Sequence, residues 1–170
     1  MATPEEIAPG FDYRPAWRLN DPEIERDAIH FWNRLAILPP GVAPEQRAKE
    51  LMGVAYRDGQ IVGVQTAELG FLQQVRARLA MIRNAVDPAV RRSHVSRALS
   101  VYTRDLMERW SAEHPEERVA GLGALIESRE LAGYGRKPWW PPAKFMLAGF
   151  TPDGRQIRVS WFQDFRLDLD

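Results

Sequence analysis

The chain has 170 residues, of which 45% are hydrophobic and 27% are charged, a composition typical of one folded domain over residues 1–170 and not of a disordered chain. Its 23 basic and 23 acidic residues give zero net charge, so we expect no nucleic-acid partner. The absence of cysteine excludes disulfide bonds, thiolate metal sites and a cysteine nucleophile.

The first residues resemble neither a signal peptide nor a membrane anchor. Residues 1–10 are acidic and contain proline, whereas a signal peptide has a basic and then an apolar part. No apolar run approaches the roughly 20 residues that a membrane span needs. We therefore expect a cytoplasmic protein without membrane association, in which residues 1–12 form a loose lead-in.

Two helices follow a short edge strand expected at Tyr13–Leu19. Asp21-Pro22-Glu23 is a strong helix start, because Asp accepts from the first free N–H groups and Pro suits the first helical position. Apolar residues at helical spacing extend this helix to about Leu35. A second, short helix is expected from Ala43-Pro44-Glu45 to about Leu51.

An antiparallel meander is predicted next. Met52–Tyr56 and Gln60–Leu69 alternate as strands do, and Asp58-Gly59 between them is a favoured two-residue hairpin turn. A third strand is expected at about Arg76–Val86.

The second half of the chain returns to helical spacing at about Arg91. This long helix is expected to end at His114-Pro115. The remaining expectations are a buried strand at Val119–Ile126, a turn or two of helix at Glu127–Tyr134, no regular structure at Gly135–Pro142, and strands at Lys144–Phe150 and Arg155–Phe165. The order predicts an α+β fold with a mixed, mainly antiparallel sheet of about seven strands flanked by helices.

The junction between the third meander strand and the long helix is a candidate phosphate site. A helix N-terminus exposes unpaired N–H groups and about half a positive charge. Positive charge and hydroxyl donors in the first turn come from Arg91, Arg92, Ser93 and Ser96. The alternative is that Asp87 or Ser93 caps the helix while the arginines face water.

The segment from Ala85 to Leu99, AVDPAVRRSHVSRAL, resembles the signature of the GCN5-related N-acetyltransferase (GNAT) superfamily. In that family an apolar strand end is followed by x-Pro-x-x and then by [Gln/Arg]-x-x-Gly-x-[Gly/Ala] at the start of a helix. Arg91 falls on the Gln/Arg position. The element order is also similar to that of the family from about residue 13 to residue 165.

The resemblance implies a single GNAT-like domain that uses acetyl-CoA or another acyl-CoA as co-substrate. The loop would hold the pyrophosphate through its N–H groups, and the preceding strand end would bond the pantetheine arm. The cofactor-binding residues implied in this way are Asn84, Ala85, Val86, Arg91, Arg92, Ser93, His94, Val95, Ser96 and Arg97.

Two departures from the family pattern affect this expectation. His94 and Ser96 stand where the family has small residues, and the change at His94 is large because Gly lets the backbone approach the phosphates. The His94 imidazole either donates to a phosphate or narrows the loop. Ala80 stands where many members carry a catalytic Glu.

Other residues are therefore the catalytic candidates. Glu68 and Glu127 are the nearest carboxylates that could order a proton-accepting water, and the alternative for each is a solvated strand-end charge. Tyr134 lies in the region where family members often carry a Tyr that protonates the leaving thiolate. Its alternative is an ordinary half-buried tyrosine.

The pair Trp139-Trp140 either lines an acyl or acceptor pocket or packs as a lid or dimer contact, and packing is the favoured interpretation. The three histidines show no ligand spacing, so no metal is predicted. Family members are often dimers, which leaves a homodimer open.

Three functional hypotheses remain. The first is an N-acyltransferase that moves an acetyl or other short acyl group from acyl-CoA to a primary amine. The second is a non-catalytic GNAT-like domain that binds a ligand or a partner. The third is an acyl-chain synthase of the same fold, with a longer acyl group lined by the tryptophan pair.

Overall fold

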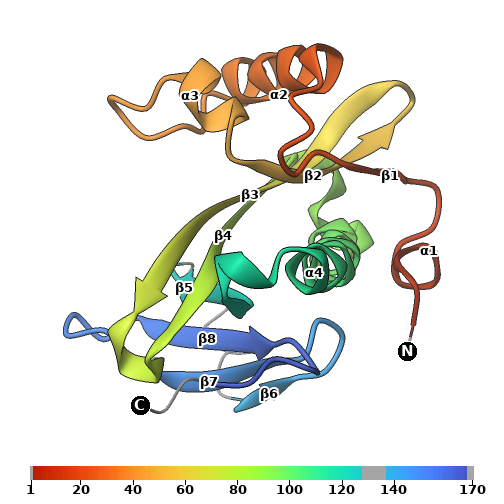
Figure 1. The fold of residues 1–170 in the computed structure, drawn as a ribbon. Helices are drawn as coiled ribbons and strands as arrows, with labels where there is room; N and C mark the ends of the chain where they lie inside the picture. Colours follow the sequence, from red (N-terminus) through yellow and green to blue (C-terminus); the bar gives the residue numbers. More distant parts are fainter. Residues whose placement is uncertain (1, 128–136, 168–170) are drawn as a thin grey trace. The chain divides into compact units, whose positions relative to one another are not determined.

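A computed structural model describes residues 2–127 and 137–167 (Figure 1). The helices are α1 (Pro4–Ile7), α2 (Pro22–Leu35), α3 (Pro44–Ala48) and α4 (Val95–Glu113), with 3₁₀ turns η1 (Gln73–Val75), η2 (Pro88–Ser93) and η3 (Pro115–Glu117). The strands are β1 (Asp12–Pro15), β2 (Leu51–Arg57), β3 (Gln60–Leu72), β4 (Ala77–Val86), β5 (Val119–Ile126), β6 (Trp139–Trp140), β7 (Phe145–Phe150) and β8 (Gln156–Trp161).

The strands confirm the predicted α+β class. Within the described ranges, eight strands form one mixed sheet in the order β1-β2-β3-β4-β5-β8-β7-β6. The β4–β5 pair is parallel, and the pairs β1–β2, β2–β3, β5–β8, β8–β7 and β7–β6 are antiparallel. Residue contacts divide the chain into two compact units. The first contains the chain up to Ala67 with Arg83–Thr103, and the second contains Glu68–Ile82 with the chain from Arg104 onward.

Helix α2 begins and ends where the sequence predicts. The Asp21 carboxylate accepts from the Glu23 amide at 2.9 Å and from the Ile24 amide at 3.3 Å, which satisfies two of the orphan donors of the first turn. The helix ends at Leu35 because Ala36 turns left-handed, with φ 50°.

The β2–β3 hairpin is also confirmed, and its turn has the expected chemistry. Asp58 and Gly59 both have positive φ, at 50° and 75°. Two successive positive φ values characterise the turn whose twist matches paired strands. The hairpin belongs to the first unit up to Ala67.

Apolar residues lie on both faces of the first unit's strands. On one face, α2 and α3 cover β2 and β3 (Figure 1) through a cluster that includes Phe31, Trp32, Val54 and Val64. On the other face, the start of α4 packs against β1–β3 through a cluster that includes Tyr13, Val62, Val95 and Leu99. The sheet is therefore buried on both sides where α4 begins.

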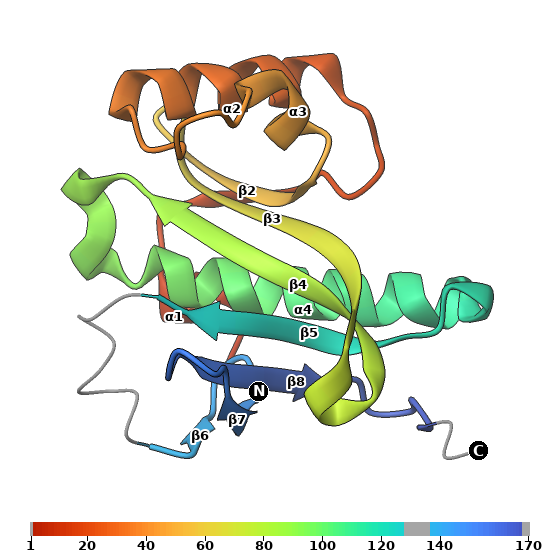
Figure 2. The ribbon, with the colours of Figure 1, turned by 90° about the vertical axis from the view of Figure 1, so that its left-hand side faces the viewer.

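In the second unit, β8 lies between β5 and β7 (Figure 2). A cluster of Ala77, Leu79, Ala120, Ile157 and Val159 forms its apolar core. Strand β5 is rich in small residues because its neighbours come close: a Cβ on Gly121 would lie 2.3 Å from the Ser160 carbonyl oxygen. That distance is far below van der Waals contact, so glycine is required at this position.

Several predicted boundaries differ from those observed. The expected loose lead-in contains α1, whose cap is a reciprocal pair in which Thr3 and Glu6 each accept from the other's amide. Strand β1 ends at Pro15 instead of Leu19, and β8 ends at Trp161 instead of Phe165. The sheet has one strand more than predicted because Trp139 and Trp140 pair with Met146 and Phe145.

No helix in the described part of the chain has the length and hydropathy of a membrane span. Among the same residues, no three His, Asp or Glu side chains gather in a way that could hold a metal ion.

Candidate functional site

The loop between β4 and α4 is the first element of the candidate site. It differs from the prediction, in which a long helix starts near Arg91. Residues Pro88–Ser93 form the 3₁₀ turn η2, His94 is left-handed with φ 63°, and α4 starts at Val95. The Ala98 amide donates to the His94 carbonyl at 3.0 Å, which starts the α-helical pattern. Arg91 and Arg92 therefore lie on the turn before the long helix.

Asp87 fixes the start of this loop. Its carboxylate accepts from the Ala89 amide at 2.9 Å and from Arg34 Nη1 at 2.8 Å, and its own amide donates to the Val62 carbonyl at 2.8 Å. The Ala89 amide, and then the Arg34 guanidinium, hold the pKa of Asp87 below its ordinary value. The alternative in which Asp87 caps the long helix is wrong, because Asp87 caps the 3₁₀ turn η2 that precedes it.

The backbone at His94 has the shape that glycine favours. A left-handed conformation is unfavourable for most residues with a Cβ, although His is among the types enriched there. His94 is exposed, and within the residues described here its ring makes no hydrogen bond. The imidazole therefore does not plug the loop, and the backbone follows the left-handed path despite the missing glycine.

The loop presents positive charge to solvent. Arg91, Arg92 and Arg97 are exposed, while Val90 and Val95 are buried and anchor the loop to the apolar core. The Ser93 hydroxyl donates to the Val90 carbonyl at 2.6 Å, so it is not the free donor that the sequence suggested. Three guanidinium groups on one short segment favour binding of an anion.

A polar network that the sequence analysis did not identify lies beside the loop. Gln65 on β3 is fully buried, and its side-chain amide donates to Asn84 and, at 3.2 Å, to Ser100. Thr103 donates to the Gln65 carbonyl oxygen, and Asn84 donates to Ser96 at 3.3 Å. The signal in the sequence was a polar stripe, since Ser96, Ser100 and Thr103 recur at helical spacing along one face of α4.

No family model matches this sequence, and no curated protein shows significant similarity to it. Solved structures do match. The chain is similar to the ribosomal-protein-S5-alanine acetyltransferase of Vibrio fischeri, with 12% identity, a TM-score of 0.61 and coverage of 93% of this chain and 96% of that one. It is also similar to a GNAT-family acetyltransferase of Streptococcus pneumoniae, with 12% identity, a TM-score of 0.56 and coverage of 90% and 99%.

This chain has the GNAT fold. A third match is N-acetylglutamate synthase of Neisseria gonorrhoeae, which was solved with coenzyme A and L-arginine. It shares 16% identity at a TM-score of 0.51, and the match covers 93% of this chain and 34% of that chain. The fold that the β4–α4 segment suggested is therefore confirmed, and the activity and site residues of this chain are a separate question.

The catalytic candidates that the structure describes lie in different parts of this GNAT fold from the cofactor-binding candidates. Ala80 is fully buried on β4, and its methyl side chain offers no acid or base. Glu68 and Glu127 are exposed and belong to the second unit, whereas all ten cofactor-binding candidates belong to the first. Glu127 accepts from Arg155 at 3.1 Å. Tyr134 lies outside the described residues.

The tryptophan pair is part of the GNAT-fold sheet, contrary to the expectation of no regular structure. Trp140 packs against the guanidinium of the fully buried Arg158, which lies 3.7 Å from its ring centroid. Arg158 also donates to the Lys137 carbonyl at 2.9 Å, and burial lowers its pKa. Trp139 is 43% exposed. The contact of Trp140 with Arg158 favours packing over an acyl-pocket wall.

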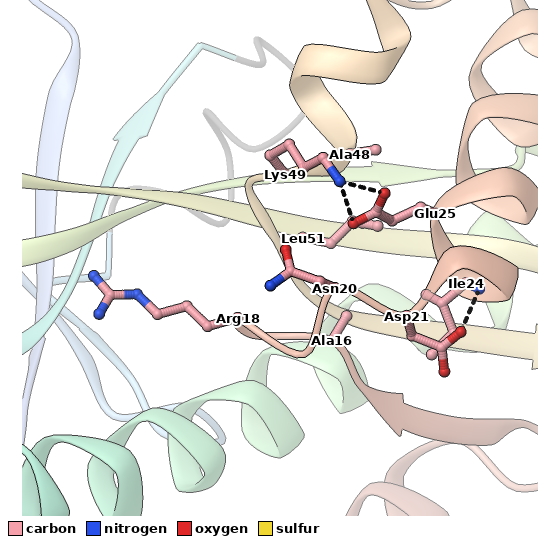
Figure 3. A pocket seen from close by; sticks show the side chains of 9 residues that line it. All are labelled: Ala16, Arg18, Asn20, Asp21, Ile24, Glu25, Ala48, Lys49 and Leu51. Atoms are coloured by element: carbon pink, nitrogen blue, oxygen red, sulfur yellow. Dashed lines mark hydrogen bonds and ion pairs between the residues drawn. The ribbon is translucent and has the colours of Figure 1, made fainter.

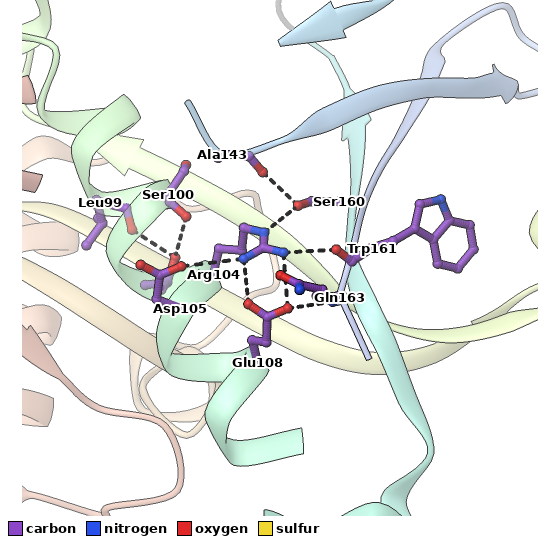
Figure 4. A network of polar contacts seen from close by, with 10 residues as sticks. Leu99, Ser100, Arg104, Asp105, Glu108, Ala143, Ser160, Trp161 and Gln163 are labelled. Atoms are coloured by element: carbon purple, nitrogen blue, oxygen red, sulfur yellow. Dashed lines mark hydrogen bonds and ion pairs between the residues drawn. The ribbon is translucent and has the colours of Figure 1, made fainter. Parts of the chain in front are cut away.

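A buried arginine on α4 has only structural partners. Arg104 is 1% exposed, and its guanidinium donates to Glu108 at 2.7 Å, to Ser160 at 3.0 Å and to the Trp161 carbonyl at 3.0 Å (Figure 4). These bonds join the later part of α4 to β8 within the second unit. Because each side of the guanidinium is engaged, Arg104 stabilises the fold and is not a site residue.

A small cavity in the first unit is too small to be a ligand site. It lies between the β1–α2 loop and α3 and has a volume of about 10 Å³ (Figure 3). That space holds about one water molecule. The charges beside it neutralise each other, since Lys49 donates to both carboxylate oxygens of Glu25 at 2.9 and 2.7 Å.

Proposed function

We propose that this protein is a GNAT-type N-acyltransferase, which moves an acetyl or another short acyl group from acyl-CoA to a primary amine. The observation that carries the proposal is the left-handed backbone at His94, within a loop that exposes Arg91 and Arg92. Acyl-CoA would supply the thioester and two adjacent phosphates. The residues present fit such a ligand, because exposed arginines supply positive charge for the phosphates and the backbone at His94 is left-handed, a conformation that glycine favours.

The first unit would provide the binding residues. Arg91, Arg92 and Arg97 would pair with phosphate oxygens, and the loop N–H groups would donate to the pyrophosphate. The strand end at Asn84–Val86 would hold the pantetheine arm. We expect binding to weaken as salt rises, because these charges are exposed.

The proton transfers would fall to Tyr134 and to Glu127 or Glu68. An amine must lose a proton before it attacks, and the departing thiolate must gain one. We assign the donor role to Tyr134 and the ordering of a proton-accepting water to Glu127 or Glu68. The exposed position of both carboxylates suits contact with water.

Calorimetry with acetyl-CoA tests the proposal. We expect micromolar binding by the natural protein and about tenfold weaker binding by Arg91→Ala, since a charge-assisted phosphate contact contributes about 1.5–3 kcal/mol when buried and less when exposed. Arg26→Ala is the matched control, because Arg26 is an exposed arginine on α2, 70% accessible, in the same unit but outside the loop. No heat at millimolar acetyl-CoA would contradict the proposal.

The alternative is a GNAT-fold domain that binds a ligand or partner without catalysis. The buried Ala80 favours this alternative, because the strand position that many family members use for a catalytic Glu carries no acid or base. Binding of acetyl-CoA without acyl transfer to any of a panel of amines would support it. A panel of acyl-CoA chain lengths would test the longer-chain hypothesis, against which the Trp140–Arg158 contact argues. A cytoplasmic location and a homodimer stay predictions.

A further inference from the structure

Asn84 and Ser96 stand on either side of the loop, and their side chains are bonded to each other. Asn84 is near the end of β4 and Ser96 is in the first turn of α4, so the 3.3 Å Nδ2–Oγ hydrogen bond closes the chain around residues 85–95. A closed segment samples fewer conformations than one held at a single end. This bond therefore reduces the conformational freedom of the loop backbone between the two residues.

The buried network fixes the Asn84 end of this bond. The Asn84 oxygen accepts from fully buried Gln65, and its amide also donates to Ser100 at 3.2 Å. Gln65 in turn accepts from Thr103, whose hydroxyl lies 2.8 Å from the Leu99 carbonyl. The buried amide of Gln65 is costly without partners, so it keeps its bond to Asn84 and favours one orientation of that exposed side chain. Asn84 lies at the surface, but its bonds to Gln65 and Ser100 restrain the side chain to which Ser96 is bonded.

We propose that Asn84 and Ser96 are positioning residues, which hold the pyrophosphate loop in its binding conformation before acyl-CoA arrives. The inference rests on the proposed function and adds to it. It attributes the ordering of the loop before ligand binding to a side-chain hydrogen bond and not to a glycine. Loop ordering opposes binding when it takes place on association. A loop that is ordered beforehand binds its diphosphate more tightly.

The test compares Ser96→Ala with the natural protein in two measurements. Amide hydrogen exchange without ligand should become about threefold to tenfold faster for residues 89–95, in line with one partly exposed hydrogen bond. The dissociation constant for acetyl-CoA, measured by calorimetry, should rise by a similar factor. Ser96→Thr keeps the hydroxyl and should restore both values.

Ser111→Ala is the matched control on the same helix. It removes the 2.7 Å bond from Ser111 to the Val119 carbonyl in the second unit. We expect it to lower stability without changing loop exchange or affinity, which separates positioning from general destabilisation. If Ser96→Ala leaves both measurements unchanged while the natural protein binds acetyl-CoA, the positioning role is wrong. If the natural protein does not bind acetyl-CoA, the proposed function itself fails, and faster loop exchange in Ser96→Ala would show ordering of the loop alone.

Discussion

Arg34, in the last turn of α2, donates to Asp87 across 53 residues of chain, with an Nη1–Oδ2 distance of 2.8 Å. Asp87 is the residue between β4 and the loop turn η2, and its side chain is 12% exposed. The pair thus ties the first long helix to the start of the candidate phosphate loop. Within the first unit, the loop is held at this end by charge and at the other end by the Asn84–Ser96 bond.

Replacing Asp87 with asparagine should lower stability in a pH-dependent way. The pKa of Asp87 lies below its ordinary value of 3.8, so its ionised form stabilises the folded state. This contribution is present above the unfolded pKa and is lost as pH falls through the folded pKa. We expect Asp87→Asn to lower the free energy of unfolding by about 1–2 kcal/mol at pH 7, because the lost bonds involve a charge but Arg34 is partly exposed.

Urea unfolding of both proteins at pH 7 and at about pH 3 measures this difference. The difference in free energy of unfolding between the two proteins should become smaller at the lower pH, where Asp87 of the natural protein begins to take up a proton and loses its charge. Asp12→Asn is a control, because Asp12 forms an exposed ion pair with Arg14, with 57% of its side chain accessible. A gap that stays constant with pH would show that Asp87 acts through packing alone.

Replacing His94 with glycine should stabilise the protein. A left-handed residue other than glycine is strained by about 1 kcal/mol, and glycine removes this strain while increasing the entropy of the unfolded chain. We expect a net gain of about 0.5 kcal/mol in the free energy of unfolding. His94→Ala keeps the Cβ and should give no gain, so the comparison separates backbone strain from loss of the imidazole. Equal stability of the two variants would indicate that the φ of 63° is not strained.

Local signals predicted much of this fold. Asp21-Pro22 at the start of α2 and Asp58-Gly59 in the β2–β3 turn succeed because their chemistry depends on residues adjacent in sequence. The sequence predicts too early a start for α4, because nothing in local propensity shows that His94 turns left-handed. The phosphate loop was located by its sequence motif, but its shape was not.

Contacts between distant residues could not be predicted in this way. The partnership of Gln65 with Asn84 joins two strands, and that of Trp140 with Arg158 joins β6 to β8. Each depends on which elements become neighbours, which a single sequence does not state. Gln65 was overlooked because it lies in an apolar strand, where a polar side chain needs partners that only the fold supplies.

Replacing Arg104 with methionine should be strongly destabilising. Burial raises the pKa of Glu108, but the Arg104 guanidinium and the Gln163 amide outweigh this effect and hold the pKa below its ordinary value, so Arg104 stabilises the charged carboxylate. Removing one partner of a buried pair costs about 3–5 kcal/mol. Glu108 is 30% exposed, so we expect the lower end of this range in urea unfolding. Arg109→Met, an exposed site one residue before Trp110 on the same helix, should change stability by about 0.5 kcal/mol or less.

Replacing Tyr134 with phenylalanine tests the proton donor in the proposed reaction. Loss of a general acid lowers turnover by about 10²-fold or more, whereas binding of acetyl-CoA does not require the phenol. We therefore expect a large fall in kcat with a dissociation constant for acetyl-CoA within about twofold of the natural value.

Tyr56→Phe is the matched control for this change. Its hydroxyl donates to Asp27 at 3.0 Å in the first unit, away from the β4–α4 loop in sequence, so its loss should lower stability and leave turnover unaltered. Steady-state kinetics with an acceptor amine found by screening, together with calorimetry, separate the two effects. If Tyr134→Phe keeps its turnover, another group or water protonates the thiolate, and Tyr134 has no part in the chemistry.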